Sequence, residues 1–518
     1  MNIPLAQRRA LTHAFFFLLV LLLGIGIRLT LILHNPDIPS DEAVYGLMAK
    51  HVAEKGEFPA YFWGRPSAGS LIAYIGAPLF FLFGSSGIVF KVGIFIFFFL
   101  PSMVCMYLLG KEIFKDQVSA LLSLLFFALP PVFVSSLSII PVGLYAEMLF
   151  FAPLIILLAY RTISHPSHWL LACSAFLWGL SLWTGFLLFP FVVFSLVVMS
   201  KNGLFSQKSR IIVALLFFIA GFSPALLYTF FHPGESFIVL AGRIIDLNRS
   251  VLAEDNFGSI LFLQAVKRFF FWIKTVSVSP IALSPLMGIS NEYPTVLLWF
   301  ISLVYAIGFL VVWLHRKNSR VLRDLFLLSV GSFIFYTLPG MGRNRHFLAL
   351  YIVIVIFLVF LLNTLKKHSK PAAYLTACAI LCFNCAGTFA ELKKKTVSFE
   401  PLITFLSTQR LFYGYSDYQV AYALTFAAKE NIIVSPTLLH PTFYEQYPPY
   451  TKKVNAQGNV FYILNSVALG NETLNFEKIL RDKKINFLKT SVGPFCVYYS
   501  FSERIYPSQL NYLQKPPR

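Results

Sequence analysis

Long apolar stretches recur along the chain and are separated by short polar segments. A run of roughly 18 or more apolar residues is long enough to cross a hydrocarbon core of about 30 Å. This pattern predicts an all-α polytopic membrane protein with about 11 spans. A break at Thr184-Gly185 divides one long run into two short crossings. The expected spans are 11–33, 88–109, 117–135, 144–160, 169–183, 186–200, 211–231, 294–314, 324–338, 347–363 and 371–390.

The composition fits a protein embedded in lipid. Of the 518 residues, 57% are hydrophobic and 13% are charged, whereas about a quarter of the residues in soluble domains are charged. A net charge of +19 would suggest nucleic acid in a soluble protein, but no soluble segment carries a basic stripe with interleaved aromatic residues. We therefore attribute the positive charge to membrane topology and expect no nucleic-acid partner.

Basic residues alternate between the loops, and this alternation predicts the orientation of the chain. Lys and Arg are concentrated near Arg8, Lys111, Lys208, Arg320 and Lys366. Such loops lie on the cytoplasmic side by the positive-inside rule. The first apolar run is longer than the core of a signal peptide, so we interpret it as an uncleaved span. The N-terminus is then cytoplasmic and the C-terminus lies outside.

Four segments fall on the outer face in this topology: loops 34–87, 232–293 and 339–346, and the tail 391–518. The tail is less hydrophobic than the rest and contains runs typical of both strands and helices. We predict a transmembrane domain over 1–390, followed by a small α/β domain over 391–518. The strand-like runs are 431–434, 460–464 and 495–501, and the helix-like runs are 417–430 and 473–483.

Acidic residues lie close to the outer ends of two predicted spans. Asp41 and Glu42 follow the first span, at the start of a predicted helix that runs through Lys50 to Ala53, where they would complement the helix dipole. Glu147 lies near the outer end of the fourth span, and ionisable residues inside spans are costly and suggest function. A simple capping role for Asp41 and a Glu147 side chain that reaches the interface are the alternatives.

Basic residues on the outer face break the charge pattern. Arg65 lies in the first outer loop, and Arg343 and Arg345 lie between the ninth and tenth spans. Guanidinium groups match phosphate oxygens in a bidentate fork, so a lipid phosphate would suit them. The arginines would stabilise charge on a leaving phosphate, while Asp41 accepts a proton from an attacking hydroxyl. Binding of lipid headgroups or outer-loop carboxylates by the arginines is the alternative.

Four sequence motifs resemble those of a known enzyme family. They are Asp41-Glu42 with Tyr45, Arg65-Pro66-Ser67-Ala68-Gly69, Tyr145-Ala146-Glu147 and Arg345-His346-Phe347-Leu348-Ala349-Leu350-Tyr351. Over nearly its whole length the chain resembles the GT-C superfamily of polyprenyl-phosphate-sugar-dependent glycosyltransferases. Within it, the chain looks most like the bacterial branch of aminoarabinose lipid A transferases and protein O-mannosyltransferases. It departs from the family pattern by Arg65 in place of a Lys, Glu147 in place of an Asp, and a missing Pro in the last motif.

The resemblance implies inverting transfer of one sugar from a polyprenyl-phosphate donor to a hydroxyl of a lipid, glycan or protein acceptor. It implies juxtamembrane helices in the first outer loop, and a bacterial inner membrane with the C-terminal domain in the periplasm. No cofactor is assigned, but a divalent metal ion stays open because some relatives bind one. The expected site residues are Asp41, Glu42 and Glu147 for catalysis, Arg65, Arg343, Arg345 and His346 for the donor phosphate, and Tyr45, Tyr61 and Trp63 for the substrate.

Two other classes of membrane protein are compatible with the hydropathy. A multi-span transporter or lipid flippase is the first alternative, and a non-catalytic membrane scaffold is the second. Transporters often show repeated halves and broken helices near the midplane, whereas this sequence shows no internal repeat. The candidate polar residues gather on the outer face, which favours an enzyme.

Overall fold

The computed structural model describes residues 5–38, 40–234, 295–317, 319–337, 344–394, 396–436, 445–465 and 470–510. The chain forms two compact units. The first consists of residues 1–32, 67–69 and 94–394, and the second of residues 33–66, 70–93 and 395–518. Most of the predicted outer loop 34–87 therefore belongs to the same compact unit as the predicted tail 391–518.

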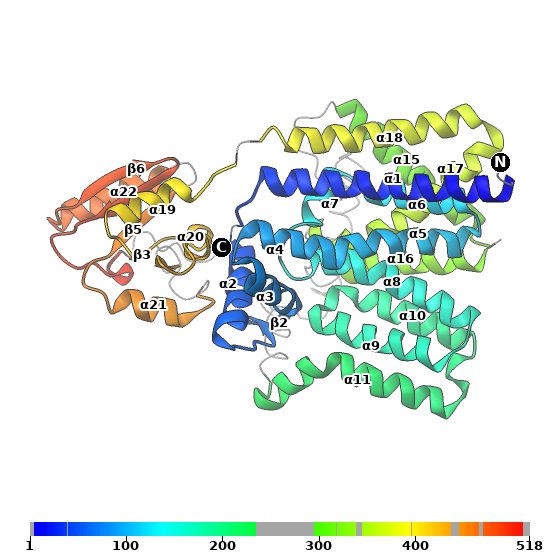
Figure 1. The fold of residues 1–518 in the computed structure, drawn as a ribbon, viewed down its shortest axis with the longest axis horizontal. Helices are drawn as coiled ribbons and strands as arrows, with labels where there is room; N and C mark the ends of the chain where they lie inside the picture. The colour runs from blue at the N-terminus through cyan, green and yellow to red at the C-terminus, as the bar shows by residue number, and fades with distance from the viewer. Residues whose placement is uncertain are drawn as a thin grey trace, which may run out of the picture. The chain divides into compact units, whose positions relative to one another are not determined.

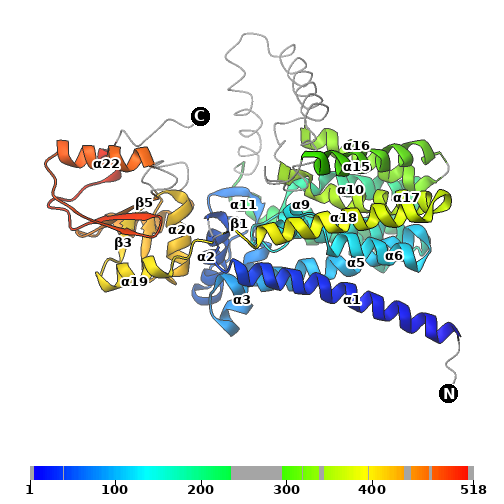
Figure 2. The ribbon, with the colours of Figure 1, turned by 90° about the horizontal axis from the view of Figure 1, so that it is seen from above.

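The first unit is a bundle of apolar helices that run alongside one another (Figures 1 and 2). Closely packed pairs include α5 with α6 and α9 with α11. In chain order the elements are α1 (Leu5–His34), η1 (Phe95–Phe99), α5 (Leu100–Phe114), α6 (Gln117–Ala128), α7 (Val132–Leu137), α8 (Tyr145–Ser164), α9 (His168–Thr184), η2 (Phe186–Leu188), α10 (Phe189–Lys201), η3 (Leu204–Ser206), α11 (Lys208–Phe231), α15 (Thr295–His315), α16 (Arg320–Thr337), η5 (Asn344–Leu350), α17 (Tyr351–His368) and α18 (Lys370–Glu391).

Six helices of the described chain are long and apolar enough to cross a membrane. Together with the fold, they make the chain an integral membrane protein and confirm the predicted fold class, whereas the number of eleven spans stays a prediction. The break at Gly185 lies where the sequence places it, between α9 and η2. The six helical segments are Ala10–His34, Gly87–Phe114, Tyr145–Ser164, Lys208–Phe231, His346–His368 and Lys370–Glu391.

The predicted span 117–135 is not one continuous helix. Its helix α6 ends at Ala128 and α7 begins at Val132, because Pro130 and Pro131 have no backbone N–H to continue the ladder. Side chains of other helices satisfy the carbonyl groups at this end. Arg28 Nη1 donates to Ala128 O at 2.6 Å, Tyr351 Oη to Phe126 O at 2.6 Å, and Asn384 Nδ2 to Leu129 O at 2.7 Å.

The second unit begins with the helices of the first outer loop. Helix α2 (Ser40–Lys55) packs against α3 (Leu71–Phe83) and against α20 (Tyr418–Ala427) of the tail. Between α2 and α3, strands β1 (Tyr61–Phe62) and β2 (Arg65–Gly69) form a two-stranded sheet. Helix α4 (Gly87–Ile94) follows α3 and continues into the first unit. The predicted helix at 41–53 is thus present, although it is two residues longer at its end.

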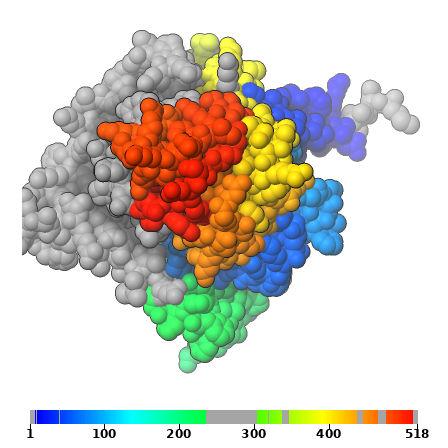
Figure 3. Space-filling view, turned by 90° about the vertical axis from the view of Figure 1, so that its left-hand side faces the viewer, coloured from blue at the N-terminus to red at the C-terminus, as the bar shows by residue number. Residues whose placement is uncertain are grey.

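The tail forms the predicted small α/β domain, whose surface appears in yellow, orange and red in Figure 3. A five-stranded sheet has the order β4-β3-β5-β7-β6. Strand β3 pairs in parallel with β4 and β5, whereas β7 pairs antiparallel with β5 and β6. The elements are α19 (Glu400–Thr408), β3 (Tyr413–Tyr415), α20 (Tyr418–Ala427), β4 (Ile433–Ser435), α21 (Pro448–Asn455), β5 (Phe461–Asn465), α22 (Gly470–Asp482), β6 (Leu488–Val492), β7 (Phe495–Tyr499) and η6 (Pro507–Gln509).

Candidate functional site

The start of α2 presents Asp41 at the surface of the second unit. The helix begins at Ser40, whose backbone has a φ of 53°, a left-handed conformation that is uncommon outside glycine. Asp41 therefore lies in the first helical turn, where the positive end of the helix dipole favours a carboxylate. Its side chain is 29% exposed, so a solute can still reach it.

A tight turn between β1 and β2 brings Arg65 to this carboxylate. The Arg65 Nη1 atom lies 3.5 Å from Asp41 Oδ2, and the guanidinium lies 5.4 Å from the centre of the Phe62 ring. The turn depends on Gly64, which has a φ of +68°. This left-handed conformation favours glycine, and a Cβ atom here would also come within 2.8 Å of Gln446 Oε1, the end of a flexible side chain that would have to move.

A third side chain reaches the same carboxylate from the tail. The Tyr418 hydroxyl donates a hydrogen bond to Asp41 Oδ1. Tyr418 is the first residue of α20 and is 8% exposed. The sequence does not predict this contact, because 377 positions separate the two residues and no local pattern links them.

Glu42, the next residue of α2, is buried, whereas Asp41 is partly exposed. Its side chain is 9% exposed, and its Oε2 atom has no hydrogen-bond partner among the residues described here. Burial raises the pKa of Glu42 to about 7, with Lys91 opposing the shift and Asp41 adding to it. Lys91 is itself held by the carbonyl oxygens of Asn35 and Asp37, at 2.8 and 2.7 Å. Glu42 can therefore carry a proton near neutral pH, beside the more accessible Asp41.

The predicted substrate-binding aromatic residues lie in the same unit, but two of them are packed against protein. Tyr45 is 2% exposed, with its ring centre 4.7 Å from that of Phe62. Trp63 stacks on Tyr447 at 4.2 Å, while Tyr61 is partly exposed on β1. Tyr45 and Trp63 thus shape the surroundings of Arg65, and their direct contact with a substrate stays a prediction.

Glu147 belongs to the first unit, at the start of α8. It is fully buried, and its Oε2 atom accepts a hydrogen bond from the backbone N–H of Leu144. Leu144 has a φ of 91°, so this contact holds a strained backbone at the helix N-terminus. The other carboxylate oxygen, Oε1, has no hydrogen-bond partner among the described residues. The observed contact is a helix cap, and the catalytic role of Glu147 stays a prediction.

Substitutions at Glu147 should separate the cap from any chemistry. A carboxamide keeps an acceptor oxygen, so Glu147→Gln should fold with a melting temperature close to that of the wild type. Glu147→Ala should lose about 0.5–2 kcal/mol, the usual cost of removing a cap. Thermal unfolding in detergent measures both. Equal stability of the two variants would contradict the cap.

The remaining predicted phosphate ligands are only partly described. Arg343 lies outside the described residues, and Arg345 lies in η5 without a described side chain. His346 follows in η5 and is partly exposed. The structure thus brings together Asp41 and Arg65 of the predicted set. The described residues contain no group of three or more His, Cys, Asp or Glu side chains that could hold a metal ion, and the question of a divalent metal stays open.

Comparison with solved structures identifies the fold of the chain. ArnT from Cupriavidus metallidurans bound to undecaprenyl phosphate matches with a TM-score of 0.59 and 10% identity, over 96% of this chain and 99% of that chain. The Archaeoglobus fulgidus oligosaccharyltransferase in its apo form matches with a TM-score of 0.54 and 12% identity, over 95% of this chain and 74% of that chain. The chain has the GT-C fold.

The likeness is one of structure and lies far below the sequence identity at which function carries over. A complex of the same archaeal enzyme with an inhibitory peptide and a dolichol-phosphate matches with a TM-score of 0.50 and 12% identity, over 96% of this chain and 74% of that chain. No protein-family model matches the sequence, and no curated protein matches it. The GT-C fold therefore confirms the expected architecture, but it does not by itself show an activity.

Proposed function

We propose that this GT-C chain is a membrane glycosyltransferase. It moves a sugar from a polyprenyl-phosphate donor to a hydroxyl acceptor on the outer face of the membrane, with inversion at the anomeric carbon. One observation carries the proposal: a chain with this fold holds Asp41 and Arg65 3.5 Å apart, each about one-third exposed, at the start of a helix that follows the first span.

Asp41 would act as the general base. The acceptor oxygen forms a bond to the anomeric carbon, the bond from that carbon to the phosphate oxygen breaks, and the acceptor proton passes to Asp41. An ionised carboxylate has about four acceptor sites, so the contacts with Tyr418 and Arg65 leave room for a hydroxyl proton. A positioned base typically contributes 10²–10⁴-fold to the rate.

Arg65 would stabilise the phosphate that leaves. A contact of 3.5 Å to Asp41 is long for a hydrogen bond between charged groups, which is usually about 2.7–2.9 Å. The guanidinium therefore keeps donors for phosphate oxygens, and a fork of five N–H groups suits them. Arg343, Arg345 and His346 are proposed to add donors to the same phosphate.

The donor class is supported by what the structural neighbours bind. One neighbour was solved with undecaprenyl phosphate and another with a dolichol-phosphate, and both are polyprenyl phosphates. The distribution of Lys and Arg supports a cytoplasmic N-terminus and an outer C-terminal domain. A bacterial inner membrane, with this domain in the periplasm, is part of the proposal.

Substitution of Arg65 tests the phosphate contact. Arg65→Ala should lower kcat/KM for the lipid-phosphate donor by roughly 10- to 100-fold, since hydrogen bonds to charged groups contribute about 1.5–3 kcal/mol. Arg65→Lys keeps the charge without the fork and should lose less. Steady-state kinetics with varied donor measures both. Donor kinetics that are unchanged in Arg65→Ala would remove Arg65 from the site.

A transfer assay tests the proposed function itself. Purified wild-type protein would be reconstituted with undecaprenyl-phosphate hexoses and pentoses, and with lipid, glycan and peptide acceptors, and the products followed by mass spectrometry. Sugar transfer with release of undecaprenyl phosphate is the expected result. Movement of the lipid across the vesicle membrane without sugar transfer would instead identify a flippase.

A further inference from the structure

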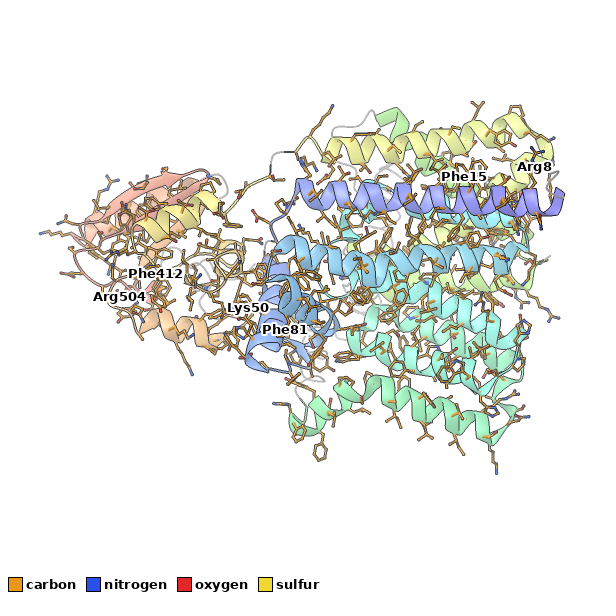
Figure 4. All side chains as sticks on the ribbon, viewed as in Figure 1. Arg8, Phe15, Lys50, Phe81, Phe412 and Arg504 are labelled. Atoms are coloured by element: carbon orange, nitrogen blue, oxygen red, sulfur yellow. The ribbon has the colours of Figure 1, made fainter. Side chains whose placement is uncertain are left out.

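Helix α20 of the tail lies along α2 and runs in the same direction. Its first residue, Tyr418, contacts Asp41 near the start of α2. Glu430, just beyond the end of α20, contacts Lys50 and Lys55 near the end of α2. Lys50 on α2 is labelled in Figure 4. The tail is therefore fixed on α2 at both ends of the helix that carries Asp41.

The backbone beneath Tyr418 is held on both sides. Ser416 follows strand β3, and its hydroxyl donates to Ile463 O on β5 at 2.9 Å. Asp417 caps α20 by accepting hydrogen bonds from the backbone N–H groups of Gln419 at 2.7 Å and Val420 at 3.3 Å. The sheet and the cap thus fix the direction in which the Tyr418 ring leaves the domain.

The Tyr418 hydroxyl is suited to act as a permanent donor. Burial, and then the neighbouring Asp41 carboxylate, raise the pKa of Tyr418 well above its ordinary value, so the phenol keeps its proton at every physiological pH. With Tyr418 on Oδ1 and Arg65 on Oδ2, the Asp41 carboxylate is held at both oxygens. Its plane, and the direction of its remaining lone pairs, are then set by residues far apart in sequence.

A close helix contact fixes the distance between α2 and α20. At Gly46, a Cβ atom would lie 2.7 and 2.9 Å from ring atoms of Phe426 and 3.1 Å from Ile38 Cδ1. Phe426 is 3% exposed, so its ring is packed against protein at this contact. Glycine at position 46 therefore permits the approach that lets Tyr418 reach Asp41.

A charged cluster locks the far end of the same contact. Glu430 accepts hydrogen bonds from Lys50 at 2.6 Å, Lys55 at 2.9 Å and Tyr450 at 3.0 Å, and its Oε1 lies 3.0 Å from His51 Nε2. The backbone of Glu430 has a φ of 64°, a conformation that a residue with a side chain keeps only where its surroundings hold it. This second contact is independent of Tyr418 and gives the tail a fixed register on α2.

We propose that the C-terminal domain is part of the active site and that Tyr418 is the positioning residue for the base Asp41. The inference rests on the proposed function, because it gives Asp41 the role of base. It assigns the tail a task in the reaction that its sequence does not suggest. Removal of the hydroxyl leaves Asp41 in place but frees its carboxylate to rotate, and misplacement of a catalytic group by about 1 Å can cost 10²-fold in rate.

A double-mutant cycle tests the contact without any need for activity. The melting temperatures of wild type, Tyr418→Phe, Asp41→Ala and the double variant are compared in detergent at pH 7. Groups in direct contact give non-additive effects, so the double variant should melt close to the lower of the two single variants. Strictly additive shifts in melting temperature would overturn the proposal, whatever the enzymatic result.

A pH profile tests the positioning role. A hydrogen bond to the charged form of a carboxylate favours that form, so loss of the hydroxyl should move the acidic limb of kcat/KM to higher pH. For Tyr418→Phe we expect this shift together with a fall in kcat of about 10- to 100-fold, and little change in donor KM. The probes are the undecaprenyl-phosphate hexoses and pentoses that the wild type uses.

Matched variants complete the design. Tyr462→Phe removes another buried hydroxyl of the same domain, one that donates to Ile505 O at 2.8 Å, and should keep the wild-type rate and profile. Gly46→Ala is the substitute if Tyr418→Phe fails to fold. It separates α2 from α20 while keeping the Tyr418 hydroxyl, and it should shift the acidic limb of kcat/KM in the same direction. An unmoved acidic limb in the folded variant overturns the inference. Absence of transfer by the wild type would instead refute the proposed function, and the double-mutant cycle would still decide the contact.

Discussion

Replacement of Asp41 by Asn should lower the rate of sugar transfer by at least about 100-fold, within the 10²–10⁴-fold range of a positioned base. The carboxamide has nearly the same shape but cannot accept the acceptor's proton, so the loss should appear in kcat and in kcat/KM alike. Initial rates at saturating donor measure it. Wild-type turnover in Asp41→Asn would remove Asp41 as the base.

The control for this variant is Asp417→Asn, which changes another acidic residue of the same unit. Asp417 caps α20, and Asn is as good a helix cap as Asp. This variant should therefore keep both its melting temperature and its activity. Asp41→Asn should also melt close to the wild type, because it keeps an oxygen that can accept the Tyr418 hydrogen bond. Inactivity that came with unfolding of Asp41→Asn would not support a role in chemistry.

Replacement of Glu430 by Ala should lower the free energy of unfolding of the protein by about 1–3 kcal/mol, because the buried Tyr450 hydroxyl and Lys50 lose the acceptor they share. The Glu430 side chain is 10% exposed, and that of Lys50 is 9% exposed. Both side chains are therefore largely shielded from solvent. Chemical unfolding, followed by the fluorescence of the protein's aromatic side chains, measures this loss of free energy.

Glu54→Gln is the matched control, because Glu54 also pairs with Lys50, at 2.9 Å, but is 52% exposed. Exposed ion pairs of this kind contribute about 0.2–1 kcal/mol, so this variant should stay near wild-type stability. Equal losses of unfolding free energy in Glu430→Ala and Glu54→Gln would contradict a buried cluster, because Glu430 would then contribute no more than an exposed ion pair.

The Glu430 cluster also predicts how stability depends on pH. Burial alone would raise the pKa of Glu430, but hydrogen bonds from His51, Lys50 and Lys55 outweigh it and hold the pKa well below its ordinary value of 4.5. The contribution of the Glu430 carboxylate to the free energy of unfolding is then complete above about pH 4.5. It is lost as the pH falls, because Glu430 binds a proton more readily in the unfolded chain than in the folded one. The melting temperature of the wild type should fall more steeply below that pH than that of Glu430→Gln. Parallel acid profiles would contradict this assignment.

Local patterns in the sequence were sufficient for the membrane helices and for the start of α2. Apolar length predicted α1, α8, α11 and α18, and an acidic pair after Pro39 predicted the helix that carries Asp41. The contact of Arg28 with the end of α6 was not predicted, because one basic residue does not interrupt a long apolar run. Strand β3 was missed because it has only three residues with glycine at its centre, and β6 because much of it is exposed.

The arrangement of the site depends on contacts that no local pattern contains. Arg65 and Asp41 were predicted as a pair from their chemistry and from family resemblance. The partners of α2 in the tail were not, since 377 positions separate Tyr418 from Asp41 and 380 separate Glu430 from Lys50. A single sequence carries the residues of such contacts but not their pairing. Only the packing of α20 on α2 shows that the tail reaches the candidate base.

The configuration of the product tests the central claim most directly. Wild-type protein would be incubated with an undecaprenyl-phosphate sugar that it uses, and the new glycosidic bond would be assigned by NMR while released undecaprenyl phosphate is quantified. We predict one undecaprenyl phosphate released per sugar transferred and an anomeric configuration opposite to that of the donor. A product that retains the donor's configuration would contradict direct displacement assisted by Asp41, as would release of the lipid phosphate without any glycosidic product.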